Sequence, residues 1–157
     1  MLIAHQEKVR HLEYICLSLS QQLNIQKQNF ITITPEGSIC TILLAEDESE
    51  VRNLIKIVLE VSGCKVIEAV DGEDAINKFI KNKDSIQLLV FDLITPKKSG
   101  KEAYDAIKKM RPDIKVLFIS GYGDDIIAKT NIYKDGLTYI LKPVSPTEIL
   151  EKVKYVM

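Results

Sequence analysis

The sequence lacks the features that mark several specialised classes of protein. Its 157 residues carry 21 basic and 22 acidic side chains, so the formal net charge is only −1. Without an excess of positive charge, there is no electrostatic reason to expect nucleic acid or an anionic membrane as a partner. No apolar run is long enough to cross a bilayer, and no basic stretch followed by an apolar one opens the chain as in a secretory signal. The sequence therefore predicts a cytoplasmic protein.

Cysteine and histidine are scarce. The three cysteines, Cys16, Cys40 and Cys64, are far apart, and no CxxC pair or Cys/His cluster occurs. Neither a disulfide framework nor a zinc site is indicated, and reduced thiols are expected. The two histidines, His5 and His11, lack the surroundings of a kinase or phosphotransfer histidine, and we interpret them as ordinary helix residues.

What is present is the composition of a soluble globular protein, with 46% hydrophobic and 27% charged residues. A turn-forming stretch at residues 35–38 separates two segments, which predicts an N-terminal amphipathic helix and linker over residues 1–38 and one domain over residues 39–157. In the first segment apolar residues recur at spacings of three and four, which is typical of a helix able to form a coiled coil and favours a homodimer. A lone helix packing on its own domain, or an extension without function, is the alternative. The register is Leu2, His5, Val9, Leu12, Cys16, Leu19, Leu23, Gln26 and Phe30.

In the second segment, short apolar runs alternate with helical patterns. This alternation predicts an α/β protein with a doubly wound parallel sheet, because parallel neighbours need crossover helices. Three helix-end signals support it: Gly63 as a helix stop, Asp71 as an N-cap, and Ser145 as an N-cap with Glu148 completing a capping box. The expected strands are residues 41–45, 64–68, 86–91, 114–119 and 137–141, and the expected helices are 49–61, 71–81, 99–110, 124–133 and a last one from 145.

Reactive side chains follow four of the expected strands. Glu46 and Asp47 come after the first strand, Asp92 after the third, Ser120 after the fourth and Lys142 after the fifth. Ligands of open parallel sheets bind at the carboxyl ends of the strands, so these side chains are expected to meet. Three crowded carboxylates favour Mg²⁺, and a lysine and a hydroxyl add a cation and a donor for a phosphoryl group. Each residue alone has an ordinary explanation, such as Asp47 capping a helix, but all of them together predict a phosphoryl-transfer site.

Four sequence motifs resemble the response regulator receiver family over about residues 39–157. The resemblance implies a flavodoxin-like (CheY-like) fold, with five parallel strands in the order 2-1-3-4-5. It also implies a role in a two-component signal transduction system. The motifs are ILLAEDE at 42–48, LVFDLITP at 89–96 with Gly100, VLFISG at 116–121 and LTYILKP at 137–143.

The resemblance implies a role for each matching position. Asp92 is the expected phosphoacceptor, which takes its phosphoryl group from a histidine kinase or phosphotransfer protein in a Mg²⁺-dependent step. Glu46, Asp47, Asp92 and the backbone carbonyl of Ile94 are the expected metal ligands. Lys142 is expected to contact the phosphoryl group. A signalling receiver of this kind is not a turnover enzyme and catalyses only its own phosphorylation and slow dephosphorylation.

The resemblance also implies a switch. Ser120 and Tyr139 are expected to move together on phosphorylation, and the bond between Lys142 and Pro143 is expected to be cis. The movement changes a face made by the helix 124–133, the fifth strand and the last helix, where a downstream protein binds. Some of the motifs are particularly similar to receivers fused to sensor histidine kinases.

Two departures from the family pattern have expected consequences. Glu46 stands where the family has aspartate, and we expect the metal site to survive the extra methylene. Ile94 and Tyr122 are large, and we expect them to shield the acyl phosphate from water.

Three other functions are compatible with parts of this pattern. An aspartate-nucleophile phosphatase needs a second acid where this chain has Ile94. A flavodoxin-type cofactor site needs a first loop that cradles phosphate, which the acidic residues 46–48 would repel. A receiver-like interaction module that takes no phosphate is the third alternative, and the complete set of acceptor residues argues against it.

Overall fold

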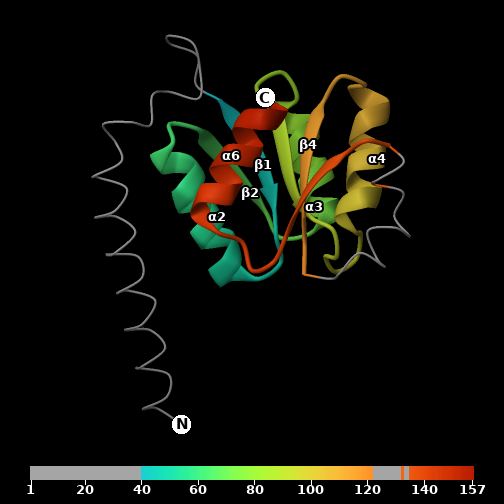
Figure 1. Ribbon diagram of the computed structural model, residues 1–157. Helices are drawn as coiled ribbons and strands as arrows, with labels where there is room; N and C mark the ends of the chain where they lie inside the picture. Colours follow the sequence, from blue (N-terminus) through green and yellow to red (C-terminus); the bar gives the residue numbers. More distant parts are fainter. Residues whose placement is uncertain (1–39, 122–131, 133–134) are drawn as a thin grey trace. The chain divides into compact units, whose positions relative to one another are not determined.

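The computed structural model describes residues 40–121, 132 and 135–157. Its centre is a five-stranded parallel sheet with the strand order β2-β1-β3-β4-β5 (Figure 1). This arrangement confirms the predicted doubly wound fold and its strand order. The strands are β1 (Thr41–Ala45), β2 (Lys65–Ala69), β3 (Leu88–Asp92), β4 (Lys115–Ser120) and β5 (Thr138–Leu141).

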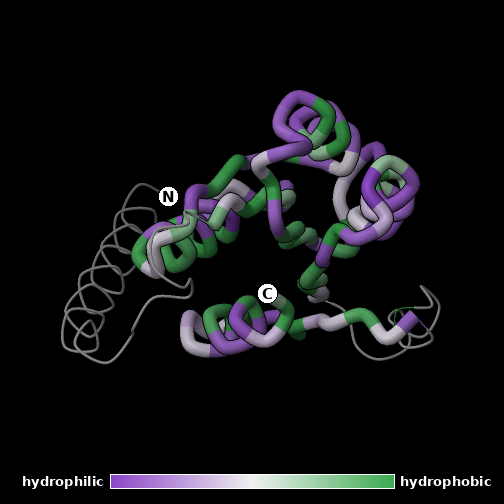
Figure 2. The backbone as a smooth tube through the Cα atoms, turned by 90° about the horizontal axis from the view of Figure 1, so that it is seen from above, coloured by the Kyte–Doolittle hydropathy of each residue, from purple (hydrophilic) through white to green (hydrophobic). Residues whose placement is uncertain are grey.

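Helices cover both faces of the sheet. The described helices are α2 (Ser49–Val61), α3 (Gly72–Asn82), α4 (Gly100–Met110) and α6 (Pro146–Val156). Hydrophobic side chains of α3 and α4 pack on one face and those of α2 and α6 on the other, which gives two separate core clusters. Figure 2 shows green hydrophobic and purple hydrophilic stretches alternating around the helices, the pattern of helices with one buried face.

The sheet is buried on both sides in its middle. Every residue of β1 and β3 is buried, which explains why both strands are nearly continuous apolar runs in the sequence. Burying one such leucine or isoleucine side chain stabilises the fold by roughly 1.5–3 kcal/mol. The hydrophobic effect therefore fixes β1 and β3 next to each other, and with them the residues that follow.

Several predicted strand limits are off by one or two residues. The second strand was predicted at residues 64–68 and lies at Lys65–Ala69, and the third was predicted at 86–91 and lies at Leu88–Asp92. Residues 114 and 137 likewise precede β4 and β5. Apolar runs mark burial, whereas strand limits depend on which backbone groups find partners on the neighbouring strand.

The helix ends largely follow the predicted capping chemistry. Gly63 has a φ of 93° at the end of α2, and the Asp71 carboxylate accepts a hydrogen bond from the Asp74 N–H at 2.8 Å. Ser145 accepts from the Glu148 N–H at 3.1 Å, as predicted for an N-cap. However, among the described helices the reciprocal capping box is found at Ser99 of α4 and not at Ser145, since only one half of the box forms there.

Two predicted helices fall outside the described residues. They are the N-terminal amphipathic helix of residues 1–38 and the helix of residues 124–133. The domain division at residues 38 and 39 therefore stays a prediction. Within the described part of the chain, no helix has the length and apolar character needed to cross a membrane.

Candidate functional site

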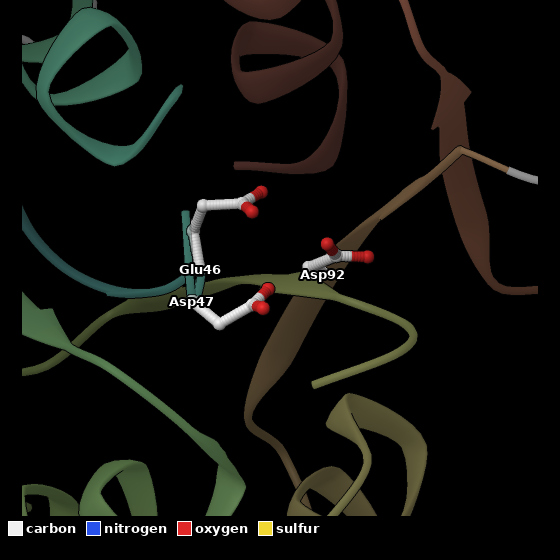
Figure 3. A group of neighbouring side chains, drawn as sticks. All are labelled: Glu46, Asp47 and Asp92. Atoms are coloured by element: carbon white, nitrogen blue, oxygen red, sulfur yellow. The ribbon is translucent and has the colours of Figure 1, made fainter. Parts of the chain in front are cut away.

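Three acidic side chains meet at the carboxyl edge of the sheet. Glu46 and Asp47 follow β1, and Asp92 is the last residue of the neighbouring strand β3. Figure 3 shows Glu46 and Asp47 extending from the end of β1 toward Asp92. One carboxylate oxygen from each residue lies within 4.8 Å of the others. The structure thus brings together the three carboxylates that the sequence placed at strand ends.

Lys142 lies between two of these acids. Its Nζ is 2.9 Å from Glu46 Oε2 and 2.8 Å from Asp92 Oδ2. The Lys142 N–H donates to the Ser120 carbonyl at 2.7 Å, which extends the pairing of β4 and β5 by one residue and fixes the start of the loop. The Lys142–Pro143 peptide bond is cis, as predicted. The lysine therefore reaches the acids from a backbone position that the sheet itself determines.

Burial and charge shift the pKa values of two of these groups. Glu46 is only 1% exposed, and burial raises its pKa from 4.5 to about 6; the Asp92 charge adds to this rise, while Lys142 opposes it. For Lys142, burial by itself lowers the pKa, but the hydrogen bond and charge of Asp92, together with those of Glu46, outweigh burial and raise it. The lysine is thus held as a cation, and the buried Glu46 is left with an unfavourable negative charge.

The residues present fit a divalent cation. Three carboxylates face one ammonium group, which leaves an excess of negative charge. Glu46 Oε2 is a buried atom without a hydrogen-bond partner of good geometry among the described residues, although Lys142 lies at ion-pair distance. Hard oxygen ligands on one side of an open site suit Mg²⁺. Glu46, Asp47 and Asp92 are therefore the candidate metal ligands.

The loop after β3 holds the second oxygen of Asp92. The Ile94 N–H donates a hydrogen bond to Asp92 Oδ1 at 3.2 Å, and Lys142 Nζ donates one to Asp92 Oδ2 at 2.8 Å. Both carboxylate oxygens of the 6%-exposed Asp92 are therefore hydrogen-bonded, so its side chain is held in one orientation. The predicted role of the Ile94 carbonyl as a metal ligand stays a prediction.

Ser120 and Tyr139 lie on the same side of the sheet. Tyr139 pairs in register with Phe118 and packs against the core cluster on the side of α3 and α4. Ser120 is two residues beyond Phe118 on β4, so its side chain leaves the strand on the same side, and it is 1% exposed. This placement is compatible with the predicted joint movement of the two residues, which stays a prediction.

Sequence reasoning missed Arg52 of α2. Its Nη1 donates to the backbone carbonyls of Glu46 at 2.7 Å and Asp47 at 3.3 Å, and its Nε lies 3.4 Å from Glu68 Oε2 on β2. Lys56 holds the other Glu68 oxygen at 2.6 Å. The only signal in the sequence was a basic residue one turn into the helix that follows the acids. Arg52 fixes the backbone from which the acid pair extends.

Gly100 lets α4 approach the phosphoacceptor candidate closely. A Cβ atom at this position would lie 2.0 Å from the Asp92 carbonyl oxygen, a distance that no side chain tolerates. The Gly100 N–H donates to the Leu93 carbonyl at 3.1 Å, so the helix start is tied to the loop that follows Asp92. The sequence contained this glycine in the second motif, with residues 89–96, but the reason for a glycine at this position is visible only in the fold.

Comparison with known proteins gives one consistent result. The family model described as "Response regulator receiver domain" matches residues 42–154. The chemotaxis protein CheY of Treponema pallidum is 29% identical over 142 residues, which are 85% of this chain and 99% of that protein. The phosphate regulon transcriptional regulatory protein PhoB of Escherichia coli is 31% identical over 118 residues, which are 74% of this chain and 51% of PhoB.

A solved structure agrees with this result. The receiver domain from the hybrid histidine kinase CckA is 32% identical, with a TM-score of 0.62, over 73% of this chain and 96% of that one. The chain thus spans nearly all of the chemotaxis protein and of this receiver domain, but only about half of the transcriptional regulator.

Proposed function

This chain belongs to the response regulator receiver domain family of two-component systems, and we propose that Asp92 accepts a phosphoryl group from a histidine kinase or a phosphotransfer protein in a Mg²⁺-dependent step. The observation that carries the proposal is the position of Lys142, within 2.9 Å of both Glu46 and Asp92 at the carboxyl edge of the sheet. A lysine ammonium group beside the nucleophilic carboxylate can neutralise negative charge on the oxygens of a transferred phosphoryl group.

The chain's own residues account for the chemistry as follows. An Asp92 oxygen attacks the phosphorus, the bond from phosphorus to the donor histidine nitrogen breaks, and an acyl phosphate forms. Lys142 neutralises negative charge on the phosphoryl oxygens, and the Ile94 N–H keeps the carboxylate oriented. Glu46, Asp47 and Asp92 would hold Mg²⁺, which stabilises the charge spread over the transferred group. Because Ile94 stands where an aspartate-nucleophile phosphatase needs a second acid, the site suits signalling rather than turnover.

The output is proposed to pass through β5 and its neighbours. Ser120 and Tyr139, which leave the sheet on the same side, would reorient toward the phosphoryl group together. Their movement would change the surface of β5 and α6, which the predicted helix of residues 124–133, outside the described residues, is expected to share. A downstream protein would bind this face. The matched residues make up only 51% of PhoB, so we extend the proposal to an attached output or hybrid histidine kinase. A cytoplasmic location and a homodimer formed through residues 1–38 are part of the same proposal.

Phosphorylation is tested by intact mass after incubation with acetyl phosphate, with Mg²⁺ or with EDTA. The wild type is expected to gain one phosphoryl group only when Mg²⁺ is present, and Asp92→Asn is expected to gain none. Asp84→Asn removes an exposed carboxylate just before β3, so it serves as the matched control and should behave as the wild type. A folded wild-type protein that gains no mass under any condition would instead indicate an interaction module that works without phosphate.

A further inference from the structure

Two cysteines lie opposite each other at the amino ends of β1 and β2, the edge of the sheet away from the acidic site. Cys40 directly precedes β1, and Cys64 directly precedes β2. The first register pair of these strands is Thr41 with Lys65, and the Lys65 N–H donates to the Cys40 carbonyl at 2.6 Å. The parallel pairing of β1 and β2 therefore extends one residue toward their amino ends, where Cys40 lies opposite Cys64.

The spacing of the strands suits a disulfide. Neighbouring strands lie about 4.8 Å apart, which is within the range of about 4.4–6.8 Å between the Cα atoms of bridged cysteines. Both side chains belong to the core cluster on the side of α2 and α6, so they leave the sheet on the same side. Both thiols are free in the structure and nearly buried, with exposed fractions of 1% for Cys40 and 5% for Cys64.

The surroundings shift the pKa values of the two thiols in opposite directions. The proximity of Cys40 lowers the pKa of Cys64 to about 7, and the Ser62 hydroxyl, 3.8 Å from Cys64 Sγ, contributes in the same direction, although burial opposes this. The same contact with Cys64, together with burial, raises the pKa of Cys40. Of the two thiols, Cys64 therefore has the lower pKa and is the candidate for the thiolate, which is the reactive form of cysteine.

We propose that Cys40 and Cys64 are a redox-active pair that hydrogen peroxide converts into a reversible disulfide between β1 and β2. The Cys64 thiolate attacks one peroxide oxygen, the O–O bond breaks, and the leaving hydroxide takes up a proton to become water. Cys40 then loses its proton and attacks the Cys64 sulfur, which releases the second water. Two thiols and one peroxide give one disulfide and two waters, and a small dithiol reverses the reaction. A small oxidant is required because the pair is nearly buried.

The disulfide would close residues 40–64 into a covalent loop and restrict the unfolded chain, so the oxidised protein would be more resistant to unfolding. In a reducing compartment such a bond is transient and suits a redox response rather than a permanent brace. Because the pair lies at the opposite end of β1 from Glu46, its oxidation is independent of the function proposed for Asp92.

The test uses the full chain, treated with hydrogen peroxide, unfolded, alkylated with iodoacetamide and mapped by mass spectrometry. We expect a linked peptide pair containing Cys40 and Cys64 that has lost two hydrogen atoms, with Cys16 alkylated. The urea midpoint of the oxidised protein should rise and should return to its initial value after dithiothreitol. Cys16→Ser should behave as the wild type, and Cys40→Ser should form no internal bridge.

Three results would overturn the proposal. They are alkylation of both Cys40 and Cys64 after peroxide treatment, a bridge from either residue to Cys16 or to a second chain, and addition of oxygen to Met157 in place of the bridge. Met157 is the most informative of these competitors, since its Sδ lies 3.3 Å from Cys40 Sγ. The mapping of the wild type decides among these outcomes without any variant having to fold.

Discussion

Replacing Glu46 with glutamine is expected to stabilise the metal-free protein at neutral pH. Glu46 is almost fully buried, and burial is the main reason why its pKa is raised from 4.5 to about 6. A carboxyl group with a higher pKa in the folded state than in the unfolded chain binds more protons when folded, so its ionisation favours unfolding. Glutamine keeps nearly the same shape and removes the charge.

The magnitude follows from the shift in pKa. A rise from 4.5 to about 6 corresponds to roughly 2 kcal/mol, at about 1.36 kcal/mol per unit. This cost is absent below about pH 4.5, grows between about pH 4.5 and 6, and is complete above that. Relative to Glu46→Gln, the free energy of unfolding of the wild type should therefore fall by about 2 kcal/mol between about pH 4.5 and 7.

The assay is urea denaturation in EDTA at about pH 4.5, 5.5 and 7, followed by the same curves in Mg²⁺. Glu151→Gln, which removes an exposed carboxylate of α6, is the matched control and should not change the pH dependence. A cation that binds only the folded protein stabilises it, so Mg²⁺ should raise the stability of the wild type more than that of Glu46→Gln.

One result would refute this reasoning. If Glu46→Gln is less stable than the wild type at neutral pH without metal, and the difference grows as the pH rises, then the ion pair between Glu46 and Lys142 outweighs the cost of burial. The carboxylate would in that case be a structural partner of the lysine, and its charge would not drive metal binding.

Two further predictions concern the loop after β3. Gly100→Ala should lower the free energy of unfolding by about 1–3 kcal/mol or more, because the new Cβ would clash with the Asp92 carbonyl oxygen. Gly121→Ala is the matched control, since the atom nearest to its new Cβ is the flexible Lys142 Cδ at 3.6 Å. Urea denaturation should show a large change for the first variant and little change for the second. Ile94→Asn should shorten the half-life of the acyl phosphate, followed by mass spectrometry after removal of the phosphodonor, because the 43%-exposed Ile94 side chain lies two residues from Asp92. A half-life that is equal or longer in the variant would contradict the shielding role.

Much of the fold was predictable because its cause is local. β1 and β3 are continuous apolar runs, and a strand buried on both faces has no other pattern available. Gly63 and Asp71 marked helix ends through backbone conformation and side-chain capping, which depend on few neighbours. The strand limits were less predictable, because they depend on partners elsewhere in the chain.

The candidate site was predictable in its members but not in its contacts. The rule that parallel strands present their carboxyl ends at one edge placed Glu46, Asp92 and Lys142 in the same region. It did not show that the Lys142 ammonium group contacts both Glu46 and Asp92, nor that Arg52 holds the backbone of the acid pair. These contacts arise from side-chain reach, which spacing along the chain does not contain.

By itself the sequence determined the class of the fold, the strand order through its resemblance to a family, and which residue types stand at the strand ends. Only the tertiary structure decided which of these groups touch. The pKa of Glu46 is raised because burial removes water from it, and Cys40 meets Cys64 because the register of β1 and β2 aligns them. Local patterns encode burial and turns, whereas register, close approach and desolvation exist only once distant segments have packed together.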